Sequence, residues 1–513
     1  MGSDVLLGHE DGTPVYLRYD HRTAHLAVLG KSRFGKTTLL EHLVLQDMRD
    51  HTAAIVIDAH GDLSKRLVSL APTGAQDALV LVEPNAERPF GLNLYERAGH
   101  TSPEAISRTV GNVLAIFLRL MGAEGRGLLP VIDQGLRSTA RVLIANDFTM
   151  AELPLLYMDA AFRSRALAKV NNPAVLQYWR DYEETTPRGR QDTRNPVLNK
   201  ASRFLEDDLI RLMVSQQRST IPFEQIMEGG GTLLFNLAGL DRESVSFLGM
   251  VFLSVLNDLL HQRERITAKD RKRVHLYLDE YGRFATSTTR HMLEECAKYG
   301  LGATLAHQSL SQTPEQEALK VETLISFQLS GEDARLVAQQ LDVSPVRMKK
   351  RLKQRMEPQY DEWEEEVWDT AANRDEHKRL QEKEKEVFRR VGGGADSYVK
   401  ARVEAQHFHE THCRIEHHQE HCGELPARNR SGTPWYDFVE ESDQSHADRR
   451  EELVTTLVTL PRHLAYCKIP DSSGVPREYK VSTLEPARTG DIKFRTLLRM
   501  SRTVKTEPFD RDT

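Results

Sequence analysis

The sequence is poor in cysteine, long apolar runs and leader-like segments. The 513 residues include only four cysteines, which are Cys296, Cys413, Cys422 and Cys467. Four are too few for a disulfide scaffold, which favours a reducing compartment. The longest apolar stretch, 247–260, is too short to span a bilayer. The first twelve residues show no basic region followed by an apolar core, so we expect no secretory signal. These features predict a cytoplasmic protein, either free or peripheral at a membrane complex.

An excess of positive charge is also missing. The formal net charge is -6, so the chain as a whole lacks the basic character of many nucleic-acid-binding proteins. Any contact with DNA must come from a local basic surface or the interior of a ring, because phosphate affinity depends on local charge. Hydrophobic residues at 39% and charged residues at 28% are typical of a soluble globular protein. The length predicts two or three domains.

A phosphate-binding loop is the strongest motif. The stretch GKSRFGKT at 30–37 matches G-x-x-x-x-G-K-[ST], with an apolar run before it and a helical pattern after it. Strand, loop and helix in that order are the context that this motif requires. Backbone N–H groups of such a loop wrap a phosphate chain, and the helix N-terminus favours negative charge. The expected ATP-binding residues are Gly30, Lys31, Ser32, Arg33, Phe34, Gly35, Lys36, Thr37 and Thr38.

An acidic pair completes the predicted ATP site. The apolar run VHLYL at 274–278 ends in Asp279 and Glu280, the form of a Walker B strand. We expect Lys36 to reach the β- and γ-phosphates, and the Thr37 hydroxyl and Asp279 to hold Mg²⁺, Asp279 through water. Glu280 is the candidate that activates the attacking water, which indicates hydrolysis rather than phosphoryl transfer to a second substrate.

A polar amide ends a third strand-like run, LGATLAHQ at 301–308. On the same edge of a parallel sheet, Gln308 could sense the γ-phosphate and relay its loss to moving parts, a catalytic role. The other interpretation is a strand-terminal glutamine that is hydrogen-bonded to loop backbone.

Together these motifs resemble the FtsK/HerA superfamily of hexameric DNA translocases. The likeness rests on GKSRFGKT, IVIDAHGDL at 55–63, LYLDEYGRF at 276–284 and LGATLAHQ, and LPRHLAY at 460–466 adds to it. The sequence is most similar to the type IV coupling proteins of conjugation, whose motor domains carry similar DPHGDL-like and HQ or TQ motifs. The resemblance implies an α/β, RecA-like P-loop NTPase fold with a doubly wound, mainly parallel sheet. It also implies ATP and Mg²⁺ as cofactors, DNA as the track and a homo-hexamer.

One segment departs from the coupling proteins. They usually carry R-K-x-G-L after the Walker B strand, and its arginine is thought to reach the phosphates of the neighbouring subunit. The matching stretch at 297–301 reads AKYGL. Lys298 could serve in part, although lysine is a poorer bidentate partner for phosphate than arginine. The other candidates are Arg283, Arg290 and Arg211, and the sequence does not choose among them.

The sequence pattern predicts five segments. Residues 1–101 and 228–345 form the two motor parts, because strand-like runs alternate there with helical patterns. Residues 102–227 have helical apolar spacing and form an inserted all-α domain. The resemblance places such a domain at the pore entrance, although it could be a packed helical subdomain without a DNA role. Residues 346–448 form a charged helical insertion, and 449–513 supply the last motor strands and a tail.

The charged insertion begins with a basic run, followed by acidic EWEEEVWD at 362–369 and a helix of mixed charge. The basic residues are Arg347, Lys349, Lys350, Arg351, Lys353 and Arg355. They could contact DNA or a partner, but the favoured interpretation is a solvated, self-paired helical hairpin.

A histidine-rich segment lies within this insertion at 407–422 and is expected to form one helix. On that helix His409, Cys413, His417 and His421 recur every four residues, and ligands one turn apart can grip zinc. Because the four positions drift around the helix, a polar solvated helix is the default interpretation.

The leading hypothesis is therefore a ring-forming, hexameric, ATP-driven DNA translocase that serves conjugative or plasmid DNA transfer. Its partners would be DNA and a relaxase, secretion channel or nuclease. A HerA-like ATPase of DNA processing or anti-phage defence is the second hypothesis. A nucleotide-switched assembly protein with slow hydrolysis is the third.

Overall fold

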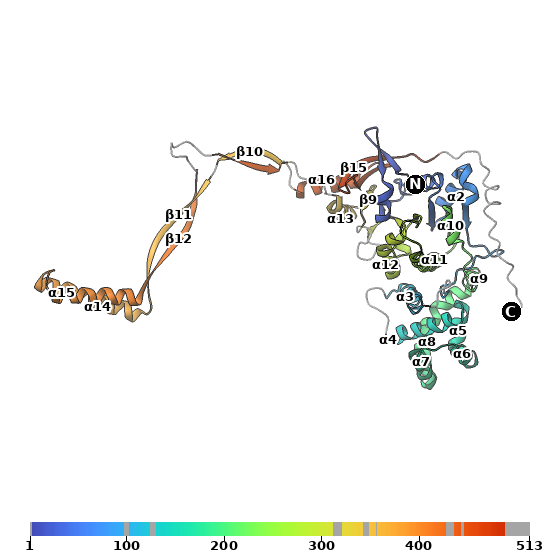
Figure 1. Ribbon diagram of the computed structural model, residues 1–513, viewed down its shortest axis with the longest axis horizontal. Helices are drawn as coiled ribbons and strands as arrows, with labels where there is room; N and C mark the ends of the chain where they lie inside the picture. The colour runs from blue at the N-terminus through green and yellow to red at the C-terminus, as the bar shows by residue number, and fades with distance from the viewer. Residues whose placement is uncertain are drawn as a thin grey trace. The chain divides into compact units, whose positions relative to one another are not determined.

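The chain divides into two compact units in the computed structural model (Figure 1). The large unit comprises Met1–Pro345 and His446–Thr513, and the charged unit comprises Val346–Ser445. The structure describes residues 3–96, 102–123, 130–310, 321–341, 348–354, 356–426, 436–442 and 446–487.

An 11-stranded sheet forms the centre of the large unit, in the order β2-β1-β15-β14-β9-β3-β8-β7-β4-β6-β5. Its strands are β1 (Val5–Glu10), β2 (Thr13–Leu17), β3 (Leu26–Leu29), β4 (Ala53–Asp58), β5 (Leu79–Val82), β6 (Thr232–Asn236), β7 (Val274–Leu278), β8 (Leu301–His307), β9 (Thr323–Ser326), β14 (Leu464–Pro470) and β15 (Pro476–Thr483). All neighbours from β9 to β5 are parallel, whereas β14, β15, β1 and β2 run antiparallel to their neighbours. The predicted α/β fold with a mainly parallel sheet is confirmed.

Helices cover both faces of the parallel part, and the strand sequences explain why. Every residue of β3, β4, β6, β7 and β8 is buried, as expected for strands packed on two sides. Successive side chains point to opposite faces, so Ala54 and Val56 pack into one cluster and Ile55 and Ile57 into another. The first cluster includes α1 (Lys36–Arg49) and α2 (Asp62–Leu70), and the second includes α11 (Arg242–Gln262).

The regular structure described between β5 and β6 is entirely helical. It comprises α3 (Pro103–Leu120), α4 (Pro130–Ala145), α5 (Leu153–Met158), α6 (Ala160–Leu167), α7 (Pro173–Glu184), α8 (Pro187–Glu206), α9 (Asp208–Val214) and α10 (Phe223–Gly229). Asn172 and Thr186 each cap a helix that has proline in its first turn. The rings of Phe204 in α8 and Phe247 in α11 stack with centroids 4.0 Å apart. These helices therefore share one hydrophobic core with the sheet.

Helix α11 is the one helix among the described residues that is long and apolar enough to cross a membrane. Its apolar window lies within Arg242–Arg265 and is 78% buried inside the protein. The burial comes from the sheet on one side and helices such as α3 on the other, so α11 is a core helix. Among its described residues, the large unit also contains α12 (Ser287–Glu295), α13 (Gly331–Leu341) and α16 (His446–Thr459).

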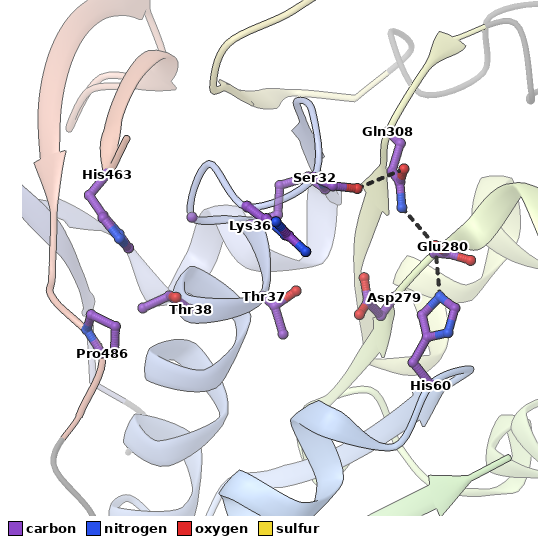
Figure 2. Close-up of a pocket in the computed structure, with 12 residues that line it drawn as sticks. Ser32, Lys36, Thr37, Thr38, His60, Asp279, Glu280, Gln308, His463 and Pro486 are labelled. Atoms are coloured by element: carbon purple, nitrogen blue, oxygen red, sulfur yellow. Dashed lines mark hydrogen bonds and ion pairs between the residues drawn. The ribbon is translucent and has the colours of Figure 1, made fainter. Parts of the chain in front are cut away.

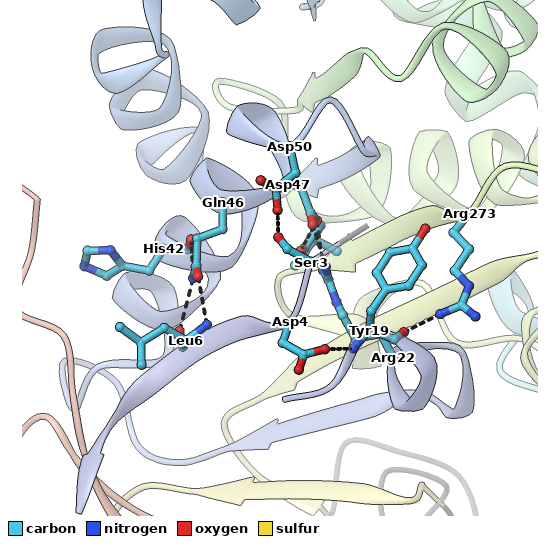
Figure 3. Close-up of polar contacts among 11 residues, drawn as sticks. Ser3, Asp4, Leu6, Tyr19, Arg22, His42, Gln46, Asp47, Asp50 and Arg273 are labelled. Atoms are coloured by element: carbon cyan, nitrogen blue, oxygen red, sulfur yellow. Dashed lines mark hydrogen bonds and ion pairs between the residues drawn. The ribbon is translucent and has the colours of Figure 1, made fainter. Parts of the chain in front are cut away.

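A buried polar network ties the P-loop helix to the Walker B strand. Asp47 of α1 accepts two hydrogen bonds from the Arg22 guanidinium, at 2.5 and 2.8 Å, and one from the Tyr277 hydroxyl of β7, at 2.5 Å. Asp47 is 1% exposed and Arg22 5% exposed. On the outer side of the same helix, Gln46 clamps the backbone of Leu6 in β1 through two hydrogen bonds (Figure 3). These contacts fix α1 against three parts of the sheet and its loops.

The charged unit consists of two antiparallel ribbons and a helical hairpin. Strands β10 (Met348–Gln354) and β13 (Tyr436–Ser442) form one ribbon, and β11 (Met356–Trp368) and β12 (Cys413–Pro426) form the other. The hairpin consists of α14 (Ala371–Val391) and α15 (Asp396–His412), with three glycines at 392–394 between them.

Two predictions for this unit are wrong. The basic and acidic runs form β10 and β11 rather than helices, and the histidine-rich segment is not one helix. It leaves α15 at His412 and enters β12 at Cys413. Cross-strand partners explain the difference: Glu364 pairs with His417, and Trp363 stacks on His418. Of the basic run, Lys349, Lys350, Arg351 and Lys353 lie on β10, while Arg347 and Arg355 lie outside the described residues.

Candidate functional site

The predicted motifs meet at the carboxyl edge of the parallel strands, where ligands bind in open α/β sheets. The P-loop follows β3, the Asp279–Glu280 pair follows β7, and Gln308 follows β8. They line a cavity of about 350 Å³ (Figure 2). Its lining residues are Ser32, Arg33, Gly35, Lys36, Thr37, Thr38, His60, Asp279, Glu280, Gln308, His463 and Pro486.

The three other predicted P-loop residues support the loop instead of lining the cavity. The backbone N–H of Gly30 donates to the His307 carbonyl at 3.1 Å, and the backbone N–H of Lys31 donates to the Gln328 carbonyl at 2.8 Å. Phe34 packs against the cluster that contains α1. These contacts hold the loop against the neighbouring strands.

Glycine is required at position 35, where the loop enters α1. Its φ is 123°, which L side chains rarely adopt, and an added Cβ would lie 2.9 Å from the Phe327 ring. The loop therefore turns in a space that only glycine fits, and it presents the N-terminus of α1 to the cavity.

The Lys36 side chain folds back onto the P-loop and is held there by hydrogen bonds to the loop backbone. Its ammonium donates to the carbonyl oxygens of Gly30 and Lys31, at 2.6 and 2.9 Å, and the residue is 7% exposed. Burial lowers the pKa of Lys36, while the negative charges of Asp279 and Glu280 act in the opposite direction. The cation thus faces the two carboxylates across the cavity.

Asp279 is a buried carboxyl that is suited to a cation. It is 8% exposed, and burial is the main factor that raises its pKa to about 6. The nearby charges of Asp58 and Glu280 raise the pKa further, while those of Lys36 and His60 oppose them. The Thr37 hydroxyl lines the same cavity (Figure 2). Oxygen donors are the ligands that Mg²⁺ prefers, so this pair fits a magnesium ion.

Glu280 is held by three side chains. Its Oε1 accepts from Gln308 Nε2 at 2.7 Å and lies 2.9 Å from His60 Nε2, and its Oε2 pairs with Arg283. Burial acts to raise the pKa of Glu280, but the hydrogen bond from His60 and the charge of Arg283 outweigh it and lower the pKa overall. The backbone is left-handed at φ 62°, a strained conformation of the kind found at functional sites. Glu280 is therefore ionised and aimed by its partners, as a base requires.

Gln308 bridges the P-loop and the Walker B pair. Its Oε1 accepts from the Ser32 hydroxyl at 3.0 Å while its Nε2 donates to Glu280. Both of these partners are side chains, so the hydrogen bonds among the described residues favour the sensor interpretation over a glutamine bonded to loop backbone.

Sequence reasoning assigned no role to two cavity-lining histidines. His60 is placed by Asp58, whose carboxylate accepts from the backbone N–H groups of His60, Gly61 and Ser64 at 2.7 to 3.0 Å. The signal was the DAHGDL stretch itself. Its first aspartate, Asp58, binds backbone N–H groups at the start of α2 and so fixes the position of His60. His463 belongs to LPRHLAY, and its backbone N–H donates to the Phe34 carbonyl at 3.0 Å. This bond ties the C-terminal strands of the large unit to the P-loop.

The four candidate cations have different surroundings. Arg283 contacts Glu280 of its own chain, whereas Lys298 pairs with Glu295 and Arg211 with Asp208 on exposed helix surfaces. Arg290 is half-buried.

A second cavity of about 490 Å³ adjoins Glu280 and Gln308. It is lined by Arg119, Arg242, Ser246, Glu280, Gly282, Arg283 and Gln308.

Comparisons with known proteins agree with this geometry. Residues 5–255 match the family described as helicase HerA, central domain. A solved structure of the bacterial conjugative coupling protein TrwBdeltaN70, in an unbound form, aligns over 96% of this chain and 91% of its own, with 14% identity and a TM-score of 0.51. The plasmid coupling protein TrwB in complex with the non-hydrolysable ATP analogue ADPNP aligns over 95% and 91%, with 15% identity and a TM-score of 0.51. No curated protein sequence matches.

The family match over residues 5–255 agrees with the predicted resemblance to the FtsK/HerA superfamily, and the solved structures share the predicted fold.

Proposed function

Because residues 5–255 carry a HerA-type central domain within a RecA-like fold, we propose that the chain is a ring-forming ATPase that moves DNA. One observation carries the ATPase part. A single cavity brings together the P-loop lysine, a buried Asp279 beside Thr37, and an ionised Glu280 that Gln308 and His60 hold in place. Phosphate binding, cation binding and activation of water each have a residue of the required chemistry there.

The residues divide the work of hydrolysis among them. The P-loop N–H groups and Lys36 hold the phosphates of ATP and offset their charge. Thr37 and Asp279 would hold Mg²⁺, which supplies positive charge to the phosphate oxygens when bound. Glu280 orients the attacking water and accepts its proton, and its lowered pKa keeps it in the basic form. Gln308 senses the γ-phosphate, because it contacts both the P-loop serine and the base.

DNA as the track is supported by the HerA helicase family and by the fold shared with a conjugative coupling protein. A ring suits this role, because a nucleotide site at a subunit boundary lets hydrolysis in one subunit move the next. We assign the chain first to conjugative or plasmid DNA transfer, cytoplasmic or peripheral at a membrane complex, with a relaxase, secretion channel or nuclease as partner. The HerA match also favours a second candidate, an ATPase of DNA processing or anti-phage defence.

The decisive experiment measures ATP hydrolysis with and without duplex DNA, for the wild type and Glu280→Gln. A translocase shows turnover that DNA stimulates and that the variant loses. Electron microscopy with an ATP analogue and duplex DNA then tests for a ring around the duplex. Hydrolysis that DNA leaves unchanged would favour the nucleotide-switched assembly protein, and failure to bind ATP would refute the ATPase itself.

A further inference from the structure

Three residues with different metal-binding atoms meet where the helical hairpin of the charged unit joins its long ribbon. Glu366 belongs to β11, His409 to the last turns of α15, and Cys413 is the first residue of β12. One ligand atom from each lies within 4.8 Å of the other two. His409 Nε2 and Glu366 Oε1 are 3.3 Å apart.

We propose that Glu366, His409 and Cys413 form a binding site for a divalent transition-metal ion of the zinc type. Thiolate, imidazole and carboxylate are the ligand types that zinc takes in proteins, whereas Mg²⁺ and Ca²⁺ select oxygen. Tetrahedral coordination with bonds of about 2.0–2.3 Å places ligand atoms roughly 3.3–3.8 Å apart. The pair of His409 and Glu366 already has this spacing, and side-chain rotation of the partly exposed Cys413 can bring its sulfur closer.

The strand register explains why the three come together. Trp368 of β11 is paired directly with Cys413 of β12. Glu366 lies two residues before Trp368 and therefore on the same face of the ribbon, diagonally across from Cys413. His409 is one helical turn before Cys413, at the end of α15, and the backbone N–H of Asp369 donates to the His412 carbonyl, which closes the junction. The backbone thus brings all three side chains to one end of the ribbon.

Aromatic packing holds the histidine in position. The Trp368 ring contacts the His409 and His377 rings, with centroids 5.3 and 4.8 Å apart, and the two histidine rings are 5.1 Å apart. His377 is 8% exposed, and its Nε2 lies 2.8 Å from the Gln381 amide. Such surrounding contacts orient a metal ligand and raise its affinity. The neighbouring carboxylate of Asp369, close to His412, adds negative charge that favours a cation.

The other candidates in this segment are used elsewhere. His417 pairs with Glu364 at 3.2 Å, the His421 ring lies against Tyr360, and the Cys422 thiol donates to the Gln359 carbonyl. The four-residue spacing in the sequence therefore does not create the site. A carboxylate from a distant strand completes it, and the three ligands leave a fourth position for water or for a group of another molecule. Bound metal would join α15 to both strands of the ribbon.

The test uses the full chain, without nucleotide or Mg²⁺, in a non-chelating reductant. Co²⁺ is the probe, because a thiolate ligand gives it a charge-transfer absorption. We expect this absorption to saturate at one ion per chain and to disappear when Zn²⁺ is added in equal amount. Cys413→Ser should abolish it, and His409→Ala or Glu366→Gln should weaken Co²⁺ binding at least tenfold. The matched controls Cys422→Ser and His421→Ala should bind as the wild type does.

Three results would overturn the site. They are no thiolate absorption in the wild type, an unchanged absorption in Cys413→Ser, or an equal loss in Cys422→Ser. The last would indicate unspecific binding by the histidine-rich surface. Circular dichroism of each variant, compared with the wild type, shows whether a loss of binding comes from the ligand or from unfolding. The outcome does not depend on the proposed ATPase activity, because the ATP site lies in the other unit.

Discussion

Nε2 of Gln308 lies 2.7 Å from Oε1 of Glu280, and the same amide accepts a hydrogen bond from Ser32 at 3.0 Å. The P-loop and the proposed catalytic carboxylate are therefore linked by side chains from three separate segments. Ser32 lies in the loop that would surround the phosphates, so its displacement would alter the hold on Glu280. This linkage gives the predicted sensor role of Gln308 a physical route.

The first prediction tests that route. Gln308→Ala removes one hydrogen bond to an ionised carboxylate, worth about 1.5–3 kcal/mol, and should slow ATP turnover by roughly 10- to 100-fold. Nucleotide affinity should change little, because Lys36 and the loop are untouched. Ser32→Ala breaks the same bridge from the other end, so the double variant should lose less than the two single losses combined. Fully additive losses in phosphate-release assays would show that the bridge does not act as a unit.

The second prediction concerns the base. Glu280→Gln keeps the shape of the side chain but cannot accept a proton, so turnover should fall by about 10²–10⁴ while ATP binding stays nearly intact. Lys36→Ala should show the opposite pattern, with weakened binding itself. Phosphate release and equilibrium nucleotide binding, measured on both variants, separate the two roles. A Glu280→Gln chain that hydrolyses ATP at the wild-type rate would remove Glu280 from the mechanism.

The third prediction follows from the raised pKa of Asp279, which is about 6. Because this pKa exceeds the unfolded value of about 3.9, Asp279 stabilises the fold most at low pH, and that contribution is lost as pH rises through 6. Relative to the wild type, Asp279→Asn should therefore gain stability as the pH rises from about 4 to about 6, by on the order of 2–3 kcal/mol without Mg²⁺. The measurement is the difference in denaturation midpoint across that range. A difference independent of pH would contradict the shift.

Magnesium should reverse the stability order of the wild type and Asp279→Asn. Mg²⁺ binds the ionised carboxylate, so wild-type affinity for Mg²⁺ should fall as pH drops below 6. The asparagine variant should bind Mg²⁺ weakly at every pH, which makes it the matched control for titrations with nucleotide present.

The parallel sheet explains why the residues of the candidate ATP site could be predicted to lie together. Each motif follows an apolar strand, and the carboxyl ends of parallel strands meet at one edge, so Lys36, Asp279, Glu280 and Gln308 had to lie near one another. His60 and His463 could not be assigned in the same way. The position of His60 depends on the hydrogen bond from its backbone N–H to Asp58. His463 reaches the P-loop from a segment more than 400 residues further along the chain.

The charged unit shows the opposite case. Local charge pattern favoured a helical insertion over 346–448 with one helix at 407–422, but pairing between 356–368 and 413–426 makes both of these segments strands. The partner of each strand lies beyond the α14–α15 hairpin, so no window of neighbouring residues contains the information. The proposed metal-binding triad could not be predicted from the sequence for the same reason, because Glu366 is 43 residues from His409.

The fourth prediction concerns the network behind the P-loop helix. Asp47→Ala would leave Arg22 as an unpaired, buried cation, which should destabilise the large unit by about 3–5 kcal/mol. Tyr277→Phe removes only a hydroxyl and should cost about 1–3 kcal/mol. Asp50→Ala is the control, because Asp50 lies on the exposed side of the same turn beside Ser3 (Figure 3). Urea midpoints from circular dichroism should rank Asp47→Ala lowest, and equal midpoints for Asp47→Ala and Asp50→Ala would refute the role of the network.

The last prediction is that hydrolysis requires a cation from a neighbouring subunit. In phosphoryl transfer, an arginine that meets the developing charge raises the rate by about 10³–10⁵. Arg283 differs from the other candidates because its partner is Glu280, the proposed base of its own chain, so we expect it to position that base rather than reach a neighbour. The remaining candidates for a contribution in trans are Arg211, Arg290 and Lys298. Changing each singly to alanine should identify one whose loss lowers turnover while ATP binding is kept.

Complementation then decides between action within a chain and action across a boundary. A subunit that lacks the trans cation keeps Lys36, and a Lys36→Ala subunit keeps the cation, so a ring that mixes the two contains some complete sites. Mixing two inactive proteins should therefore restore ATP turnover. The Arg283→Ala protein is the control: mixed with Lys36→Ala subunits it should stay inactive, because both groups serve the same chain. Restored activity with Arg283→Ala would make Arg283 the trans residue. Failure of every mixture, with specific activity independent of protein concentration, would refute the intersubunit site.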